Sequence, residues 1–338
     1  MYRSILVPLD GTPFGEHALP AAMAIARRTG AALHLVHVHV PETAWSAIEG
    51  VPHLGANLRE LVVQREQGYL DGVRERLAAS GVAVDARILD GPVARTLAES
   101  ARQERVDLVA LSTHAHTGLS RLWHRGVASY LTRHLSVPVL LVHAPDAPAE
   151  LDVEVAVRRV LLPLGGRAYS ERVLDHAVEL GRACEARFTL LEVVAPPVET
   201  GYTLLGQDGH VNEFELQERR ERALGYLEGV AGRLRARGVH VDAEVVPSSD
   251  AASAIVDYVE RAGAAGDPVG IIAMETHGLG GAAHLFTPSV VEQVVHETSV
   301  PVLAHHTAVA EGVPLEDGAA MGWGAQRGAA APGDLPAA

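Results

Sequence analysis

The sequence predicts an α/β protein made of two tandem, doubly wound domains, each with a five-stranded parallel sheet. Short apolar runs alternate along the chain with segments of helical periodicity, which is typical of parallel strands joined by right-handed crossover helices. The chain also repeats itself, because Thr113, Ser136 and Val139 recur as Thr276, Ser299 and Val302, each 163 residues later. A repeat of this length indicates duplication of a whole domain.

Each predicted strand of the first half is a short, continuous apolar run, as expected for a strand buried on both faces. The runs are residues 3–10, 32–40, 82–89, 106–111 and 137–143. Ala and Leu at helical spacing predict helices over residues 16–28, 57–79, 92–104 and from about 126 onward. Gly30 and Gly81 follow the first two helices, where a glycine C-cap is expected.

The second half repeats this order with a growing offset. Residues 160–164 match residues 5–9 at an offset of 155, residues 238–243 match residues 81–86 at 157, and residues 270–274 match at 163. The insertions therefore lie in loops, where they are tolerated best. We predict domains over residues 1–144 and 158–307, a linker over 145–157, and a disordered tail rich in Ala, Gly and Pro over 308–338.

Charge and composition exclude several classes of function. The net charge of −14 argues against general binding to nucleic acid or anionic membranes, whose phosphates require a basic surface. All 28 basic residues are Arg, which excludes a P-loop and any Schiff-base mechanism, since both need Lys. The sequence contains neither a GxSxG elbow nor an ordered Ser-His-Asp triad. We therefore expect no catalytic site.

The sequence also predicts a cytoplasmic location and no metal site. No apolar run approaches the roughly 20 residues that span a bilayer, and Met1 leads directly into a strand, so we expect a cytoplasmic protein. The single Cys184 follows a helical apolar pattern, as a buried structural thiol would. Although 18 His are present, including His37 and His39 on one strand face, no zinc-type spacing supports a metal site, and none is predicted.

Four motifs resemble the universal stress protein family in its tandem form. They are ILVPLDGTPFGEHAL at the start, LVHVHVP at the end of the second strand, THAHTGLSRL after the fourth and SVPVLLV at the fifth, with weaker counterparts in the second half. The resemblance covers about residues 2–306. It implies a strand order of 3-2-1-4-5 in each domain, a Rossmann-like arrangement of the adenine nucleotide alpha hydrolase-like type. Its ligand crevice lies where the first and fourth strands diverge.

In nucleotide-binding members of the family, ATP lies in this crevice, beside an Asp that ends the first strand and along a glycine-patterned loop that opens a helix. Glycines let the backbone approach phosphates, and free N–H groups at the helix start bind anions. The resemblance thus implies ATP or ADP as the cofactor. The implied first-domain positions are Pro8, Leu9, Asp10, Val38, Ser112, His114, Ala115, Arg125, Gly126 and Val127. Their second-domain counterparts are Pro163, Gly165, Val193, Met274, His277, Gly278, Ser289 and Val290.

The first phosphate loop departs from the family pattern of Gly, two residues, Gly, nine residues, Gly and then Ser or Thr. Ser112 and Ala115 replace the first two glycines. An ungapped match puts Arg125 at the third glycine, whereas a one-residue insertion puts Gly126 there and Val127 after it. Asp10 is retained, although it also fits an ordinary turn that ends a strand.

The second phosphate loop departs further. Gly165 replaces the Asp, and Glu275 and Pro288 replace the first and third glycines. A carboxylate at position 275 repels phosphate, and Pro288 has no N–H to donate. Thr287 and Pro288 also fit a structural helix start. We therefore expect nucleotide in the first domain rather than the second.

The leading interpretation is a non-catalytic, cytoplasmic stress-response protein with adenine nucleotide in its first domain. One alternative is a nucleotide-free interaction or regulatory module whose crevices have degenerated, and another is a weak ATPase. Family members pair through their fifth strands, so we expect residues 139–142 and 302–304 to pair internally about a pseudo-two-fold axis, which would cover two exposed edges. A homodimer is a further assembly that such pairing allows.

Overall fold

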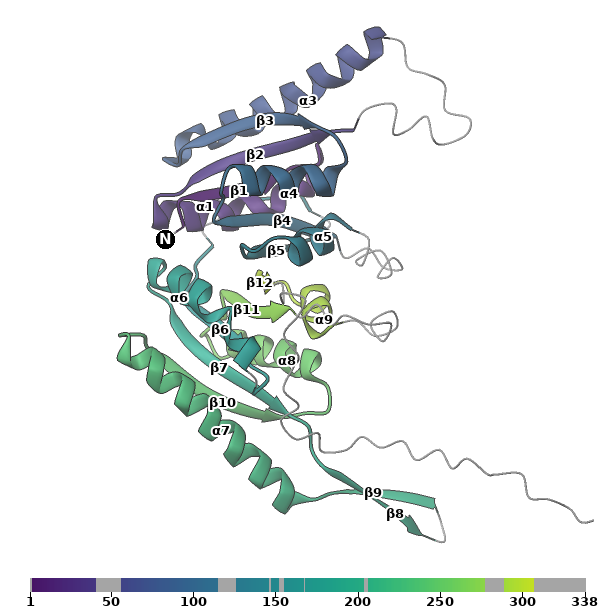
Figure 1. Cartoon of the computed structure of the whole chain (residues 1–338), viewed down its shortest axis with the longest axis vertical. Helices are drawn as coiled ribbons and strands as arrows, with labels where there is room; N and C mark the ends of the chain where they lie inside the picture. Colours follow the sequence, from purple (N-terminus) through teal and green to yellow (C-terminus); the bar gives the residue numbers. More distant parts are fainter. Residues whose placement is uncertain are drawn as a thin grey trace, which may run out of the picture. The chain divides into compact units, whose positions relative to one another are not determined.

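The computed structural model shows an α/β architecture in both halves of the chain (Figure 1). It describes residues 2–40, 56–114, 126–145, 147–151, 155–166, 168–203, 206–276 and 289–306. The predicted tail and residues 146 and 152–154 of the predicted linker lie outside the described residues.

The described part of the first half alternates parallel strands and helices. Its strands are β1 Ser4–Pro8, β2 Ala32–His39, β3 Val84–Asp90, β4 Leu108–His114 and β5 Val139–Ala144. Its helices are α1 Ala18–Thr29, α3 Ala56–Leu77, α4 Val93–Gln103 and α5 Val127–His134, with 3-10 turns at Gly15–His17 and Ala78–Ser80. Gly30 and Gly81 have φ of 75° and 74°, the left-handed conformation of the predicted C-caps.

The second half has the same series and one addition. Its parallel strands are β6 Arg159–Pro163, β7 Arg187–Val194, β10 Val241–Pro247, β11 Ile271–Thr276 and β12 Val302–His306. Its helices are α6 Leu174–Ala183, α7 Glu213–Ala236, α8 Ala251–Ala264 and α9 Val290–Glu297, with a 3-10 turn at Ala168–Glu171. An antiparallel hairpin of β8 Val198–Thr203 and β9 Gly206–Val211 forms a separate two-stranded sheet that the sequence did not predict.

Both halves have the strand order 3-2-1-4-5, so the predicted fold class is confirmed. The order is β3-β2-β1-β4-β5 in the first half and β10-β7-β6-β11-β12 in the second. Helices α1, α3, α6 and α7 contribute to the core on one face of the sheet. Helices α4, α5, α8 and α9 contribute to the core on the other. Because both faces are covered, the strands appear in the sequence as continuous apolar runs.

The two halves meet through β5 and β12, which pair antiparallel. Val302 lies opposite Leu141, and Ala304 lies opposite Val139. These four side chains are at most 1% exposed, so the contact is part of the core. The pairing makes one continuous sheet of ten strands and removes two strand edges from solvent.

The start of the fifth strand and the position of Cys184 differ in detail from the predictions. The fifth strand begins at Val139 rather than at residue 137, since Pro138 has no N–H for the strand ladder. Cys184 lies at the C-cap of α6 rather than inside the helix, and it is half-buried. Burial nevertheless raises the pKa of the Cys184 thiol, which favours the unreactive thiol over the thiolate.

Candidate functional site

The first-domain crevice begins where β1 ends at Pro8. β1 pairs with β2 on one side and β4 on the other, so the loops that follow β1 and β4 leave the sheet in different directions. The backbone N–H of Leu9 donates to the carbonyl of Val36 at 2.9 Å and fixes the end of β1. Val38 lies two residues farther along β2 and is buried.

Asp10 closes a turn and keeps one oxygen available. Its Oδ1 accepts hydrogen bonds from the backbone N–H of Thr12 at 2.9 Å and from the Thr12 hydroxyl at 2.7 Å. Gly11 has a φ of 82°, and a Cβ at Gly15 would stand 2.5 Å from Asp10 Oδ1. Asp10 therefore stabilises the turn through Oδ1. No described residue bonds to Oδ2 of this exposed carboxylate, so Oδ2 is an acceptor that a ligand could use.

Ser112 and His114 lie on β4, at the other side of the crevice. The Ser112 hydroxyl donates to the carbonyl of Gly15 at 3.1 Å, so the residue that replaces the first loop glycine ties β4 to the turn after β1. His114 is the last residue of β4. Ala115 and Arg125 lie outside the described residues, and their placement stays a prediction.

The helix that follows the first loop has an open start. Gly126 is the N-cap of α5 and provides no side-chain hydrogen bond, and Val127 is the first helical residue. The first N–H groups of a helix have no partner within the helix and carry the positive end of its dipole. Since no described residue caps these donors, an anion at this position could accept hydrogen bonds from them.

The equivalent helix in the second domain has a closed start. Ser289 caps α9, where its hydroxyl accepts from the N–H of Glu292 at 3.2 Å and its own N–H donates to Glu292 Oε2 at 3.1 Å. This capping box uses the N–H groups of Ser289 and Glu292 and places a carboxylate beside the helix start, where a phosphate would have to approach. Val290 follows as the first helical residue.

The remaining second-domain positions form a different crevice. β6 ends at Pro163, and the N–H of Gly165 donates to the Ser170 hydroxyl at 3.3 Å. Met274 on β11 is buried and Val193 on β7 is half-buried. His277 and Gly278 lie outside the described residues.

The Glu275 carboxylate is expected from the sequence to repel phosphate, but in the structure this carboxylate is buried and bonded to a histidine. The Glu275 side chain is 3% exposed, and Oε2 accepts from Nδ1 of His305 on the neighbouring strand at 2.7 Å. The carboxylate is therefore held toward β12. The sequence reasoning missed this partner because the two residues are 30 positions apart.

A polar cluster beside the first crevice was also missed. Nδ1 of His37 bonds to the carbonyl of Leu9 at 2.8 Å, and because a carbonyl only accepts, Nδ1 must carry the proton. Glu66 of α3 lies 2.9 Å from Nδ1 of His39 and 3.5 Å from Nε2 of His37. The only sequence signal was the spacing of the two histidines on one strand face.

Neither a metal cluster nor a membrane span is found among the described residues. No group of three or more His, Cys, Asp or Glu side chains in that part of the chain could hold a metal ion. Of the described helices, none has an apolar stretch long enough to cross a bilayer.

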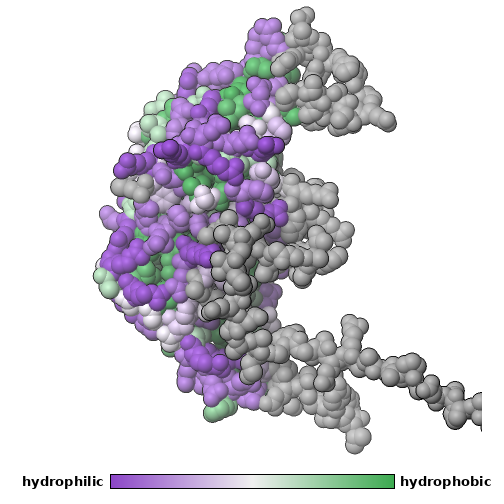
Figure 2. Space-filling model, viewed as in Figure 1, coloured by the Kyte–Doolittle hydropathy of each residue, from purple (hydrophilic) through white to green (hydrophobic). Residues whose placement is uncertain are grey.

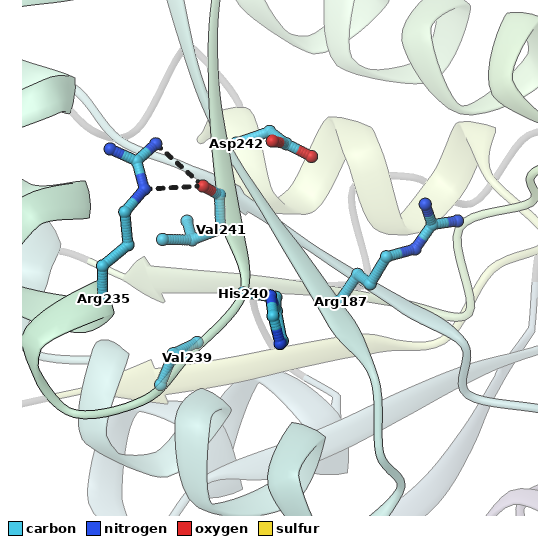
Figure 3. A pocket seen from close by; sticks show the side chains of 6 residues that line it. All are labelled: Arg187, Arg235, Val239, His240, Val241 and Asp242. Atoms are coloured by element: carbon cyan, nitrogen blue, oxygen red, sulfur yellow. Dashed lines mark hydrogen bonds between the residues drawn. The ribbon is translucent and has the colours of Figure 1, made fainter.

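A hollow of about 410 Å³ lies at the amino ends of β7 and β10, away from the crevices (Figure 3). Its lining includes Arg187, Arg235, His240 and Asp242. Figure 3 shows the two guanidinium groups pointing to opposite sides, with Arg235 bonded to the carbonyl of Val241. Arg187 also pairs with Asp267 at 2.7 Å. The donors do not converge, so this hollow is not a preformed anion site.

The sequence profile of the universal stress protein family matches residues 1–143 and 156–306. The chain belongs to this family. One universal stress protein, from Methanocaldococcus jannaschii, is 28% identical over 147 residues, which is 43% of this chain and 84% of that protein. Another, from Thermus aquaticus, is 30% identical over 145 residues, covering 42% of this chain and 99% of its own. Each thus corresponds to one domain of this tandem universal stress protein.

Solved structures of the family share the fold across both domains. A universal stress protein from Archaeoglobus fulgidus superposes with a TM-score of 0.62 at 15% identity, covering 90% of this chain and 96% of that one. One from Pseudomonas aeruginosa superposes with a TM-score of 0.55 at 16% identity, covering 90% and 93%. At these identities the likeness concerns the fold alone.

Proposed function

We propose that this universal stress protein is a non-catalytic, cytoplasmic stress-response protein whose first domain binds an adenine nucleotide, ATP or ADP. The observation that carries the proposal is the contrast between the two helix starts. α5 begins at Gly126 with no side-chain cap, whereas α9 begins at Ser289 with a capping box that includes Glu292. Phosphate groups bind to free N–H donors at a helix start and are repelled by a carboxylate there.

The first-strand carboxylate supports the same assignment. Asp10 retains an oxygen without a partner among the described residues, and family resemblance implies that it contacts the ribose. Gly165 stands at the equivalent place in the second domain and offers no side chain. The first crevice thus combines an acceptor for hydroxyl groups with donors for phosphates.

A nucleotide-free interaction module remains the second candidate, and Ser112 favours it. Its side chain fills the place of a loop glycine and is bonded to Gly15, so the backbone is less open to phosphate. A large contiguous apolar patch on a protein surface would mark a site for a protein partner. On the face shown in Figure 2, the described surface is mainly hydrophilic, with small and separate hydrophobic areas.

We also propose that the two domains form an internal pseudo-two-fold pair. The antiparallel pairing of Leu141 with Val302 and of Val139 with Ala304 supports this arrangement. A 180° rotation exchanges the members of an antiparallel pair of equivalent strands.

A calorimetric titration of ATP, ADP and AMP into the whole protein tests the proposed function. We expect one nucleotide per chain, with Asp10→Ala weakening binding at least about tenfold because a hydrogen bond to a charged acceptor is lost. Glu292→Gln in the second domain is the matched control and should leave this affinity unchanged. Absence of heat at millimolar nucleotide would favour the interaction module instead.

A further inference from the structure

The ten-stranded sheet ends at β3 in the first domain and at β10 in the second (Figure 1). An outermost strand presents a row of backbone N–H and carbonyl groups to which another strand can be added. The other two domain edges are already used, because β5 pairs with β12. The outer strands are therefore the edges at which a second protein chain could extend the sheet.

Every second residue of β3 directs its backbone groups away from β2. At the two ends of the β2–β3 ladder, the carbonyl of Ala83 accepts from the N–H of Leu33 at 2.8 Å, and the N–H of Gly91 donates to the carbonyl of His39 at 3.1 Å. Because backbone groups alternate sides along a strand, the odd-numbered residues of β3 face β2. No other described strand pairs with the opposite side. The residues that face outward there are Val84, Ala86 and Ile88.

The side chains of β3 are self-complementary about Ala86. Two copies of a strand that pair antiparallel around one residue place the residue before it opposite the residue after it. Asp85 of each copy would stand opposite Arg87 of the other, and Val84 would stand opposite Ile88. Opposite charges and apolar side chains that meet across strands are stabilising. Moving one strand by two residues would instead set Arg87 against Arg87 or Asp85 against Asp85, so the charges specify one register.

Both charged side chains are accessible to a partner. The Asp85 side chain is 52% exposed, and the Arg87 side chain is 34% exposed. Each also has a neighbour in its own chain, since Asp85 pairs with Nδ1 of His34 and Arg87 pairs with Glu104. These neighbours hold the two side chains in place before a partner arrives, which lowers the entropy cost of association.

The edge of β10 lacks this complementarity. Glu244 stands at the position of Arg87, 157 residues later, so self-pairing around Ala243 would place Asp242 opposite Glu244. β10 also ends at Pro247, which has no N–H to donate. Like charges and proline are features by which natural edge strands avoid adding another chain. The second-domain edge is thus protected, whereas the first-domain edge is not.

The helices beside the two edges differ in the same sense. On α3, which packs on β3, Leu61 is 59% exposed, and Val62 and Val63 are each 37% exposed. Their counterparts on α7, 157 residues later, are Glu218, Arg219 and Arg220. Exposed apolar side chains that gather on one surface mark sites of protein contact. The exposed apolar side chains and the self-complementary edge therefore belong to the same outer end of the molecule.

We propose that two copies of this chain associate through the outer edges of their first domains. β3 pairs antiparallel with β3 of the second copy around Ala86, and the two sheets become one. The interface is isologous, so each complementary pair occurs twice. The outward backbone groups supply the ladder of hydrogen bonds, and the pairs of Asp85 with Arg87 set the register. The inference does not rest on nucleotide binding by either domain.

Pairing of β3 with β10 of another copy fits less well. It would place Arg87 opposite Asp242 but Asp85 opposite Glu244, so an attractive contact comes with a repulsive one. Such a heterologous contact would also leave a free edge at each end and build open chains of copies. Self-pairing of β3 has neither disadvantage and gives a closed dimer.

Sedimentation velocity of the full chain over about 1–100 μM tests the association. We expect a reversible dimer and no larger species. Ala86→Pro removes the outward N–H on the two-fold axis but leaves the ladder to β2, and it should weaken the dimer at least about tenfold. Ala243→Pro makes the same change at the equivalent outward position of β10 and is the matched control, which should leave the dimer unchanged.

Charge variants test the register. Arg87→Glu copies the second-domain residue and sets two carboxylates opposite each other, whereas Asp85→Arg sets two guanidinium groups opposite each other. Each variant alone should dimerise at least about tenfold more weakly. An equimolar mixture of the two variants should form a heterodimer, because opposite charges then meet at both positions. Recovery on mixing separates repulsion at the interface from loss of folding, since mixing does not refold a misfolded chain.

Three results would overturn the inference. They are a monomer throughout the concentration range, a dimer that survives Ala86→Pro, and a mixture of the charge variants that forms no heterodimer although both variants unfold cooperatively. Larger species that Ala243→Pro removes would also overturn it, because they indicate pairing of β3 with β10. If a charge variant does not fold, the two proline variants decide. None of these results bears on nucleotide binding, which calorimetry measures separately.

Discussion

The two domains keep the same support beneath the crevice and differ in the crevice itself. The support is an acid–Tyr–Arg cluster, which we define as Glu16, Tyr69 and Arg76 in the first domain and Glu171, Tyr226 and Arg233 in the second. In both copies the Arg, on α3 or α7, pairs with the acid on the 3-10 turn. Burial is the main cause that raises the pKa of each Tyr, to about 12 for Tyr226.

Other side chains on the second strand and the following helix differ between the two domains. His39 and Glu66 bond to each other in the first domain. Their counterparts, Val194 and Ala223, belong with Leu216 to a small apolar cluster in the second. Residues that hold the helix on the sheet were thus retained after duplication, whereas residues beside the crevice changed in polarity. Exchanging equivalent residues between the domains tests this distinction.

The largest expected effect comes from a compensating pair in the core. A Cβ at Gly181 would stand 2.2 Å from Cζ of Phe188, whereas the first domain has Ala26 and Leu33 at these positions. Gly181→Ala should therefore destabilise the protein by about 3 kcal/mol through overpacking. Denaturant unfolding followed by circular dichroism measures this loss.

The double variant Gly181→Ala with Phe188→Leu recreates the first-domain pair and is the control. It should recover most of the lost stability, because the smaller side chain leaves room for the new methyl group. The expectation fails if Gly181→Ala leaves the free energy of unfolding unchanged, or if the double variant is no more stable than Gly181→Ala. Either result would show that the first-domain pair of residues cannot replace the second-domain pair.

The next largest effect is the difference in stability loss when the Arg of the acid–Tyr–Arg cluster is removed from each domain. Glu16 is 8% exposed and Glu171 is 24% exposed. Arg76→Ala leaves the more deeply buried carboxylate unpaired and should cost about 2 kcal/mol, against about 1 kcal/mol for Arg233→Ala. The unfolding free energies of the two variants provide the measurement, and equal losses would argue that burial does not set the difference.

A smaller effect concerns the two helix starts. Ser289→Ala removes the capping box of α9 and should cost about 1 kcal/mol. Gly126→Ala, at the N-cap of α5 where no side-chain bond exists, tests whether that position depends on a capping side chain at all. We expect the loss for Ser289→Ala to be the larger of the two in chemical denaturation, and the reverse order would contradict the assigned caps.

The smallest effect is a change in pH dependence. Burial, and then the neighbouring His305, lower the pKa of His176, and the two rings lie 4.6 Å apart. Since the folded state disfavours the protonated ring, stability should decrease as pH falls below the ordinary histidine range. His176→Ala, which restores the residue found at Ala21, should flatten this decrease in unfolding midpoints measured between about pH 5 and 8. If the unfolding midpoint of His176→Ala depends on pH as strongly as that of the unmodified protein, the decrease comes from other titratable groups.

The fold was readable from the sequence because buried parallel strands and their glycine caps leave local patterns, as at Gly30 and Gly81. The hairpin of β8 and β9 was not, since its polar and glycine-rich strands pair outside the main sheet and show no apolar run. Asp10 could be predicted as a site residue from the family resemblance. The hydrogen bonds of His37 to Leu9 and of Glu275 to His305 could not be predicted, because each joins residues about 30 positions apart that only tertiary packing brings together.

The junction of β5 with β12 has a consequence for stoichiometry. A dimer of identical single domains carries two copies of one crevice, since one coding sequence specifies both. Here the two copies are encoded separately, and their contact is intramolecular, so its occupancy does not depend on protein concentration. An exchange such as Gly165 for the Asp10 of the first domain alters one crevice while the other is untouched. The chain therefore carries two crevices that evolve independently in a fixed one-to-one ratio.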